Sequence, residues 1–197
     1  GLMLTGIFRG AIGDVEPSSI ELYALEDIQD LSQYGIEIVR GEDEGSTPDG
    51  PDYTISSNLQ DGASSSLDSG SFYTISSNSI YQRSWFSIFP EEENFLSYFD
   101  GNDAIILYKN GKIVDVYGVP GENGFGSSWD YTLGWTYRKD GSVYSSTFNA
   151  ADWINCRGCS DGAAESAGGL RQFAAGRRSR AVPRTAGGRG AHRQAGG

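Results

Sequence analysis

The sequence predicts an all-β fold, a β-sandwich or barrel of short strands, on three observations. Runs rich in Ile, Val, Leu, Tyr and Phe alternate with clusters of Gly, Asp, Asn and Ser at short intervals, which is typical of such folds. The dipeptide Asn110-Gly111 lies between two apolar runs and suits a type I′ turn, the commonest signal of a β-hairpin. Signals for helices are few and short.

The apolar runs define the candidate strands, and two further segments are expected to form a single helical turn each. The helical turns are expected in LEDIQDLSQY and in PEEENFLSYF, where Pro90 and the three following Glu residues match the preferences of a helix N-terminus. The candidate strands, in chain order, are Leu2–Phe8, Ser19–Tyr23, Tyr34–Val39, Tyr53–Ser56, Ser71–Ile75, Ala104–Lys109, Lys112–Tyr117 and Gly134–Tyr137.

A two-residue turn at Asn110-Gly111 also predicts the register of the hairpin. Lys109 is expected opposite Lys112 and Tyr108 opposite Ile113, and the same count pairs Leu107 with Val114, Ile106 with Asp115 and Ile105 with Val116. Opposite residues share a face of the sheet, so one face should pack on the core and the other should be partly wet. The expected core face carries Ile105, Leu107, Val114 and Val116, and the wet face carries Ile106, Tyr108, Ile113, Asp115 and Tyr117.

Charge and composition divide the chain into a body, residues 1–155, and a tail, residues 156–197. The body holds 7 Lys and Arg against 24 Asp and Glu, whereas the tail holds 8 Arg against 2 acidic residues. Such an acidic body is expected to repel nucleic acid. The tail is rich in Ala, Gly and Arg and is expected to be a disordered or extended basic segment. A solvated linker is its favoured interpretation, and binding to RNA, DNA or an acidic protein surface is the alternative. A second interpretation is that the tail is not native protein sequence.

The sequence contains few signals for the cellular location of the protein. No apolar run approaches the roughly 20 residues that span a bilayer, and no signal peptide is visible. The chain opens on GLMLTGIFRG without an initiator Met, which suggests a processed or trimmed chain. We therefore expect an extracellular or organelle-lumen protein whose targeting segment is not in this chain.

Five blocks of the body follow one another in a distinctive order: SIELYAL (19–25), DIQDLSQYGIEI (27–38), FDGNDAIILYKNGKIVDVYGVPGENG (99–124), WDYTLGWTYRKDGS (129–142) and FNAADWI (148–154). Together they resemble the lamin tail domain family, in its bacterial and algal secreted branch. The resemblance covers most of residues 1–154, with Ala24 standing where Asn is common. It implies an immunoglobulin-like antiparallel β-sandwich and a non-catalytic module that is often found beside extracellular nuclease or phosphatase domains.

The residue types of the body leave little room for catalysis. The only histidine of the chain is His192, in the tail, so the body holds no Ser-His-acid or Cys-His arrangement. A hydrolase that uses two carboxylates is formally possible because acids are plentiful, but most of them fall in turns, where Asp bonds to nearby backbone amides. We therefore expect no enzymatic activity and no cofactor.

Acidic clusters and the two cysteines are candidate ligand sets for metals. Asp100 and Asp103 lie in a tight loop and are the least improbable Ca²⁺ ligands, although solvated loop charge is the simpler interpretation. Cys156 and Cys159 form a C-x-x-C pair that lacks the further ligands of a closed zinc site. A local disulfide or two incidental thiols are the expected states of this pair.

Aromatic residues supply the other candidate binding site. Trp129 and Tyr131, close to period two with Trp135, are expected either to form a sugar-stacking platform or to lie inside the sandwich. Trp135 and Trp153 are expected in the core. Trp85 and Phe86, together with Ile88 and Phe89, are expected to fill one end of the sandwich.

The sequence thus predicts a non-catalytic β-sandwich that acts as a protein-interaction or structural subunit of a larger assembly, with other protein subunits as partners. The alternative is a carbohydrate- or Ca²⁺-dependent surface-binding module of a secreted protein, such as an accessory domain to an extracellular nuclease or phosphatase.

Overall fold

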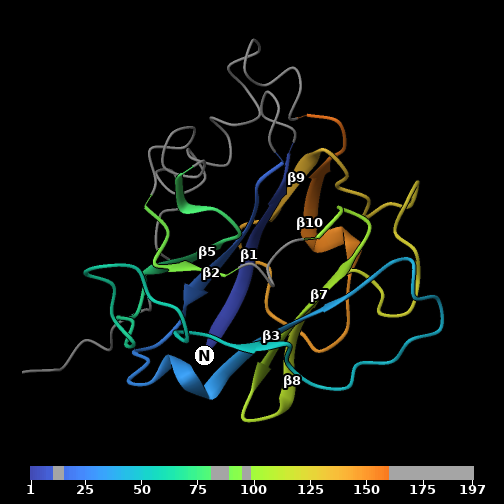
Figure 1. Cartoon of the computed structure of the whole chain (residues 1–197). Coiled ribbons are helices and arrows are strands. Elements are labelled where there is room, and N and C mark those ends of the chain that lie inside the picture. The colour runs from blue at the N-terminus through green and yellow to red at the C-terminus, as the bar shows by residue number, and fades with distance from the viewer. Residues whose placement is uncertain (11–15, 81–88, 95–98, 160–197) are drawn as a thin grey trace, which may run out of the picture.

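A computed structural model describes residues 1–10, 16–80, 89–94 and 99–159 of the chain. These residues form two β-sheets that share one core, and two short 3₁₀ turns, η1 (Leu31–Gln33) and η3 (Ala150–Asp152), lie between strands (Figure 1). The expected all-β character and the β-sandwich arrangement are therefore confirmed. No helix in the described ranges is long and apolar enough to cross a membrane.

The larger sheet has the strand order β10-β9-β1-β2-β5-β6. Its central strand β1 pairs antiparallel with β2 on one side and with β9 on the other, and only β5 and β6 run parallel. Figure 1 shows β1 and β2 running through the middle of this sheet. The strand bounds are β1 (Leu2–Arg9), β2 (Ser18–Ala24), β5 (Phe72–Ser76), β6 (Glu92–Glu93), β9 (Gly134–Arg138) and β10 (Trp153–Cys156).

The smaller sheet has the strand order β4-β3-β7-β8 and is antiparallel throughout. The hairpin at Asn110-Gly111 joins β7 to β8, and both turn residues have the positive φ that a type I′ turn requires. The strand bounds are β3 (Tyr34–Val39), β4 (Tyr53–Thr54), β7 (Ala104–Lys109) and β8 (Lys112–Tyr117).

The main core lies between the two sheets and is built by alternation along each strand. Ile20 and Leu22 of β2 meet Ile105 and Leu107 of β7 in one continuous cluster. A second, smaller cluster covers the other face of the four-stranded sheet and consists of Val39, Ala104, Ile106, Tyr108 and Val116. Both faces of β7 are therefore buried, and the expected wet face of the hairpin is not wet.

The predicted register of the hairpin is correct next to the turn and wrong beyond it. Lys109 pairs with Lys112 and Tyr108 with Ile113, but Leu107 then pairs with Asp115 because one extra residue bulges from β8. Ile106 consequently pairs with Val116, and Ile105 with Tyr117. The bulge turns Asp115 and Tyr117 toward the main core and Val116 to the outer face, the reverse of the expected arrangement.

Most expected strands are confirmed to within about two residues, and two strands were missed. β6 consists of two glutamates, and β10 is a four-residue strand at the composition break. The helical turn expected in LEDIQDLSQY is present as η1, whose Asp30 carboxylate accepts a hydrogen bond from the Ser32 amide. The turn expected after Pro90 is wrong for Glu92–Glu93, which form β6 alongside β5.

Several expectations fall on residues outside the described ranges, including Trp85, Phe86 and Ile88 and the tail from residue 160 onward. Phe89, which was expected in the same cluster as Trp85, is 65% exposed rather than buried.

Candidate functional site

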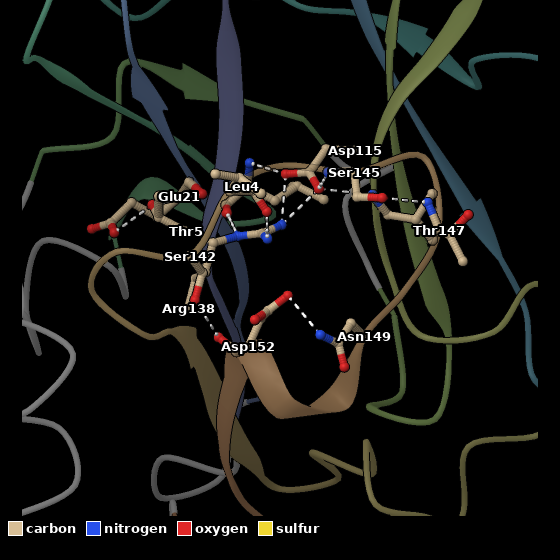
Figure 2. Close-up of polar contacts among 12 residues, drawn as sticks. Leu4, Thr5, Glu21, Asp115, Arg138, Ser142, Ser145, Thr147, Asn149 and Asp152 are labelled. Atoms are coloured by element: carbon tan, nitrogen blue, oxygen red, sulfur yellow. Dashed lines mark hydrogen bonds and ion pairs between the residues drawn. The ribbon is translucent and has the colours of Figure 1, made fainter.

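The most extensive polar cluster in the described part of the chain lies between the sheets and contains Asp115 of β8 and Arg138 of β9. Both side chains are almost fully buried, and Nη2 of Arg138 lies 2.6 and 2.7 Å from the two carboxylate oxygens of Asp115 (Figure 2). The β-bulge makes this contact possible because it turns Asp115 toward the opposite sheet.

Backbone groups complete the cluster on every side. Leu4 donates its amide to Oδ2 of Asp115 at 2.9 Å and accepts a hydrogen bond from Nε of Arg138 at 2.8 Å. The Ser145 amide donates to Oδ1 of Asp115, and the Val143 carbonyl accepts from Nη1 of Arg138. The Arg138 guanidinium also lies 4.5 Å from the centre of the Trp153 ring. Every charged atom of the pair thus has a structural partner, and the cluster acts as a clamp between the sheets.

Burial raises the pKa of Asp115, and the Arg138 charge together with the amides of Ser145 and Leu4 opposes that shift. Oδ1 of this carboxylate accepts from Arg138, Ser145 and Val116, and Oδ2 accepts from Arg138 and Leu4. The geometry is that of a buried ion pair whose two partners are fully hydrogen-bonded.

Trp129 and Tyr131 lie inside the main core, not on the surface. Tyr131 is fully buried, Trp129 nearly so, and both pack edge-on against Tyr117. The Tyr117 hydroxyl donates to the Trp129 carbonyl, and Phe148 and Trp153 complete the cluster of rings. A sugar would need an exposed ring face for stacking, so this placement does not fit the platform hypothesis and fits the core alternative. Trp153 is buried in the main core, as expected. Trp135 is buried too, but it is not part of the main core cluster and stacks on Tyr137.

Asp100 and Asp103 share a loop but differ in environment. Asp103 is buried, and its carboxylate accepts hydrogen bonds from the amides of Gly41 and Asp100, each at 2.8 Å. Burial raises the pKa of Asp103, and these two amides oppose the rise. Asp100 is half exposed and lies 3.7 Å from Arg9. Asp103 thus fixes the loop, and the described residues contain no group of three or more potential ligands that could hold a metal.

Two glutamates, neither of which was predicted to be buried, are also acceptors. Glu92 of β6 accepts hydrogen bonds from the Ser56 amide at 2.8 Å and the Tyr73 hydroxyl at 3.0 Å. Glu37 of β3 accepts a short hydrogen bond from the Tyr108 hydroxyl and another from the Asp49 amide. The alternation of β3 could have indicated that Glu37 faces outward with Tyr108, but no sequence signal showed that this outer face is buried.

The Tyr108–Glu37 contact leads to a testable prediction. Tyr108→Phe should lower the free energy of unfolding by about 1–3 kcal/mol, because a buried carboxylate oxygen loses its donor. Burial and the bond to Glu37 both raise the pKa of Tyr108, which keeps the hydroxyl protonated as a donor. Urea unfolding measures the change, with Tyr144→Phe as the control because Tyr144 is substantially exposed. Equal losses in the two variants would contradict the assignment.

Cys156 and Cys159 form a disulfide at the end of β10, one of the two states expected for this pair. Arg157, between them, lies 3.3 Å from the buried carboxylate of Asp130 and 4.4 Å from the centre of the exposed Phe125 ring. The disulfide therefore closes a turn that fixes one arginine against the loop before β9.

A pocket of about 470 Å³ lies beside β6. Its two exposed apolar side chains are Ile80, which is 69% exposed, and Phe89, which is 65% exposed. The other lining residues are Gln60, Asp61, Gly62, Ala63, Ser79, Pro90 and Glu91. Neither composition nor spacing singled out this site, because its three wall segments are far apart in sequence.

Comparisons of the chain with protein-family models, with characterised proteins and with solved structures give no significant match in any of the three.

Proposed function

We propose that this chain is a non-catalytic β-sandwich module that binds another protein, as a subunit of a larger assembly. The observation that carries the proposal is the pocket beside β6, whose lining includes the exposed side chains of Ile80 and Phe89. Large apolar side chains gathered at one hollow are a common mark of an interaction surface.

The use of the acidic residues supports the non-catalytic part of the proposal. The carboxylates of Glu37, Glu92, Asp103 and Asp115 are buried, and each accepts hydrogen bonds from backbone amides as well as from tyrosine or arginine side chains where these are in reach. Carboxylates engaged in this way satisfy buried donors of the fold, so the burial of these four residues requires no reaction to explain it.

We also propose that the fold is an immunoglobulin-like, lamin-tail-like sandwich located outside the cytosol. The two sheets over one core, antiparallel apart from the β5–β6 pair, support this assignment, as does the resemblance of the five sequence blocks. The disulfide at the end of β10 agrees with an oxidising compartment.

Zero-length coupling of carboxylates to amines, applied to the native source of the protein, tests the proposal. Because the body is rich in acids and poor in lysine, the expected products join its exposed Asp and Glu residues to lysines of one recurrent partner, in fixed stoichiometry. A chain that migrates only as a single polypeptide after coupling, or turnover of a substrate by the intact protein, would contradict the proposed function.

A further inference from the structure

We propose that the disulfide between Cys156 and Cys159 is a thiol–disulfide exchange site, and that its opening frees Arg157 and Gly158 from the loop before β9, residues 125–133. We call residues 156–159 the redox latch. The latch goes beyond the proposed function and does not depend on it.

The disulfide connects a residue inside the larger sheet to a residue beyond it. Cys156 is the last residue of the edge strand β10 and pairs with Trp135 of β9, whereas Cys159 follows the end of the strand. The Cα atoms of the two cysteines lie 5.6 Å apart, a separation typical of disulfides. The bond therefore ties the turn formed by Arg157 and Gly158 to the edge of the sheet.

This turn contacts the loop before β9 at three points. The Gly158 amide donates to the Thr132 carbonyl at 2.9 Å. Nη1 of Arg157 lies 3.3 Å from Oδ2 of Asp130, and the guanidinium lies 4.4 Å from the centre of the Phe125 ring. All three contacts come from the two residues between the cysteines, so the ring that the disulfide closes restricts the conformations from which they form.

Asp130 carries the effect of the latch into the loop. Its carboxylate is buried and accepts hydrogen bonds from the amides of Gly126 at 2.6 Å and Thr132 at 2.9 Å, in addition to its contact with Arg157. When Arg157 moves away, the buried carboxylate loses this cation, which makes its charge less stable. Opening of the latch should therefore also loosen the bond from the Gly126 amide.

Contacts outside the latch hold the rest of the sandwich together. Asn155, immediately before the latch, donates to the Ser128 carbonyl and accepts a hydrogen bond from the Tyr117 hydroxyl at 3.0 Å. The ion pair of Arg138 and Asp115 joins the two sheets at another place. Opening of the latch is thus expected to be a local event at the end of β10.

A dithiol opens the latch by two exchange steps. A thiolate of the dithiol attacks the sulfur of one cysteine, the bond between the protein sulfurs breaks, and the other cysteine leaves as a thiolate that takes up a proton. The second thiol of the reagent attacks this mixed disulfide, frees the first cysteine and closes the disulfide of the reagent, so the protein is reduced and the dithiol oxidised. Both cysteines are partly exposed, and exposed disulfides are the labile ones.

Native-state hydrogen exchange of the intact ¹⁵N-labelled protein, with and without dithiothreitol, tests the latch. Reduction should accelerate exchange of the Gly158 amide about twentyfold, the factor given by the closure entropy of so short a ring. Exchange of the Gly126 amide should accelerate about threefold, because Asp130 loses a half-exposed ion pair. The amides of Leu4 and Ser145, which donate to Asp115, should keep their rates.

The double variant Cys156→Ser/Cys159→Ser is the matched control. Without any thiol it should show the fast Gly158 exchange of the reduced wild type, and dithiothreitol should not change that rate. Alkylation with iodoacetamide, read by intact mass, verifies reduction of the wild type.

Three results would each overturn the inference. The first is an unchanged Gly158 rate after verified reduction. The second is equal acceleration at Leu4 and Ser145, which would make the disulfide a support of the whole fold. The third is a disulfide that dithiothreitol reduces only in denaturant, which would exclude an exchange site on the folded protein.

Discussion

Replacement of Arg138 by Met should lower the free energy of unfolding by about 3–5 kcal/mol, because it leaves the Asp115 carboxylate buried without its cation. Methionine retains much of the apolar stem, so the change tests the charge and its hydrogen bonds more than the packing. The two carboxylate contacts and the bonds to the Leu4 and Val143 carbonyls are lost together. Urea unfolding at pH 7 provides the measurement.

The deficit of Arg138→Met should shrink at low pH, and the sign follows from the pKa of Asp115. Burial already raises that pKa and Arg138 opposes the rise, so the variant's folded pKa should be higher still. A folded pKa above the unfolded value, about 3.9, means that folding takes up a proton between the two values. The variant should therefore recover stability relative to wild type as the pH falls toward 4.

Arg157→Met is the matched control for this prediction. Arg157 also pairs with a buried aspartate, at 3.3 Å, but it is 48% exposed, and Asp130 keeps the amides of Gly126 and Thr132 as donors. Because Arg157 is exposed in this way, its loss should lower the free energy of unfolding by less than about 1 kcal/mol. If Arg138→Met and Arg157→Met lose equal stability, or the Arg138→Met deficit grows at low pH, the clamp interpretation is wrong.

Replacement of Gly134 by Ala should lower the free energy of unfolding by about 3 kcal/mol or more, because the new methyl group has no room between β9 and β10. Gly134 begins β9, and a Cβ there would lie 1.8 Å from the carbonyl oxygen of Cys156 on β10. That oxygen belongs to the backbone, so β10 itself must move away. Urea unfolding should show the loss, and hydrogen exchange of the Ile154 amide should accelerate with it.

Gly141→Ala separates this clash from ordinary glycine strain. Gly141 has a φ of +81° but open space where a Cβ would stand, so only the strain of a left-handed alanine applies, roughly 1–2 kcal/mol. A Gly134→Ala variant no less stable than Gly141→Ala, with unchanged exchange at Ile154, would show that β10 does not approach β9 this closely.

The strands were predictable from the sequence where apolar alternation and turn residues coincide. The Asn110-Gly111 turn and the strands on either side are the clearest case, since positive φ at both positions is a local property of Asn and Gly. β6 was not predictable, because two glutamates have little intrinsic strand preference. They pair with β5, and Glu92 there accepts hydrogen bonds from the Ser56 amide and the Tyr73 hydroxyl.

The candidate sites were less predictable than the strands because each depends on contacts between distant residues. The bulge in β8 could not be predicted from the hairpin sequence, because Arg138, the ion-pair partner of the inward-turned Asp115, lies on the other sheet. The period-two aromatic pattern placed Trp129 and Tyr131 together correctly but could not say which side of the layer faces solvent. The pocket combines a loop and two segments from other regions, which no local pattern links.

The bulge at Asp115 also bears on how this protein behaves at high concentration. β8 is the last strand of its sheet, a position from which identical molecules can polymerise by strand addition. Here the Val116 amide is already bound by Oδ1 of Asp115, and the same oxygen holds the Ser145 amide. An incoming strand would have to displace these contacts and straighten the backbone of β8. This edge of the sheet should therefore resist fibril growth.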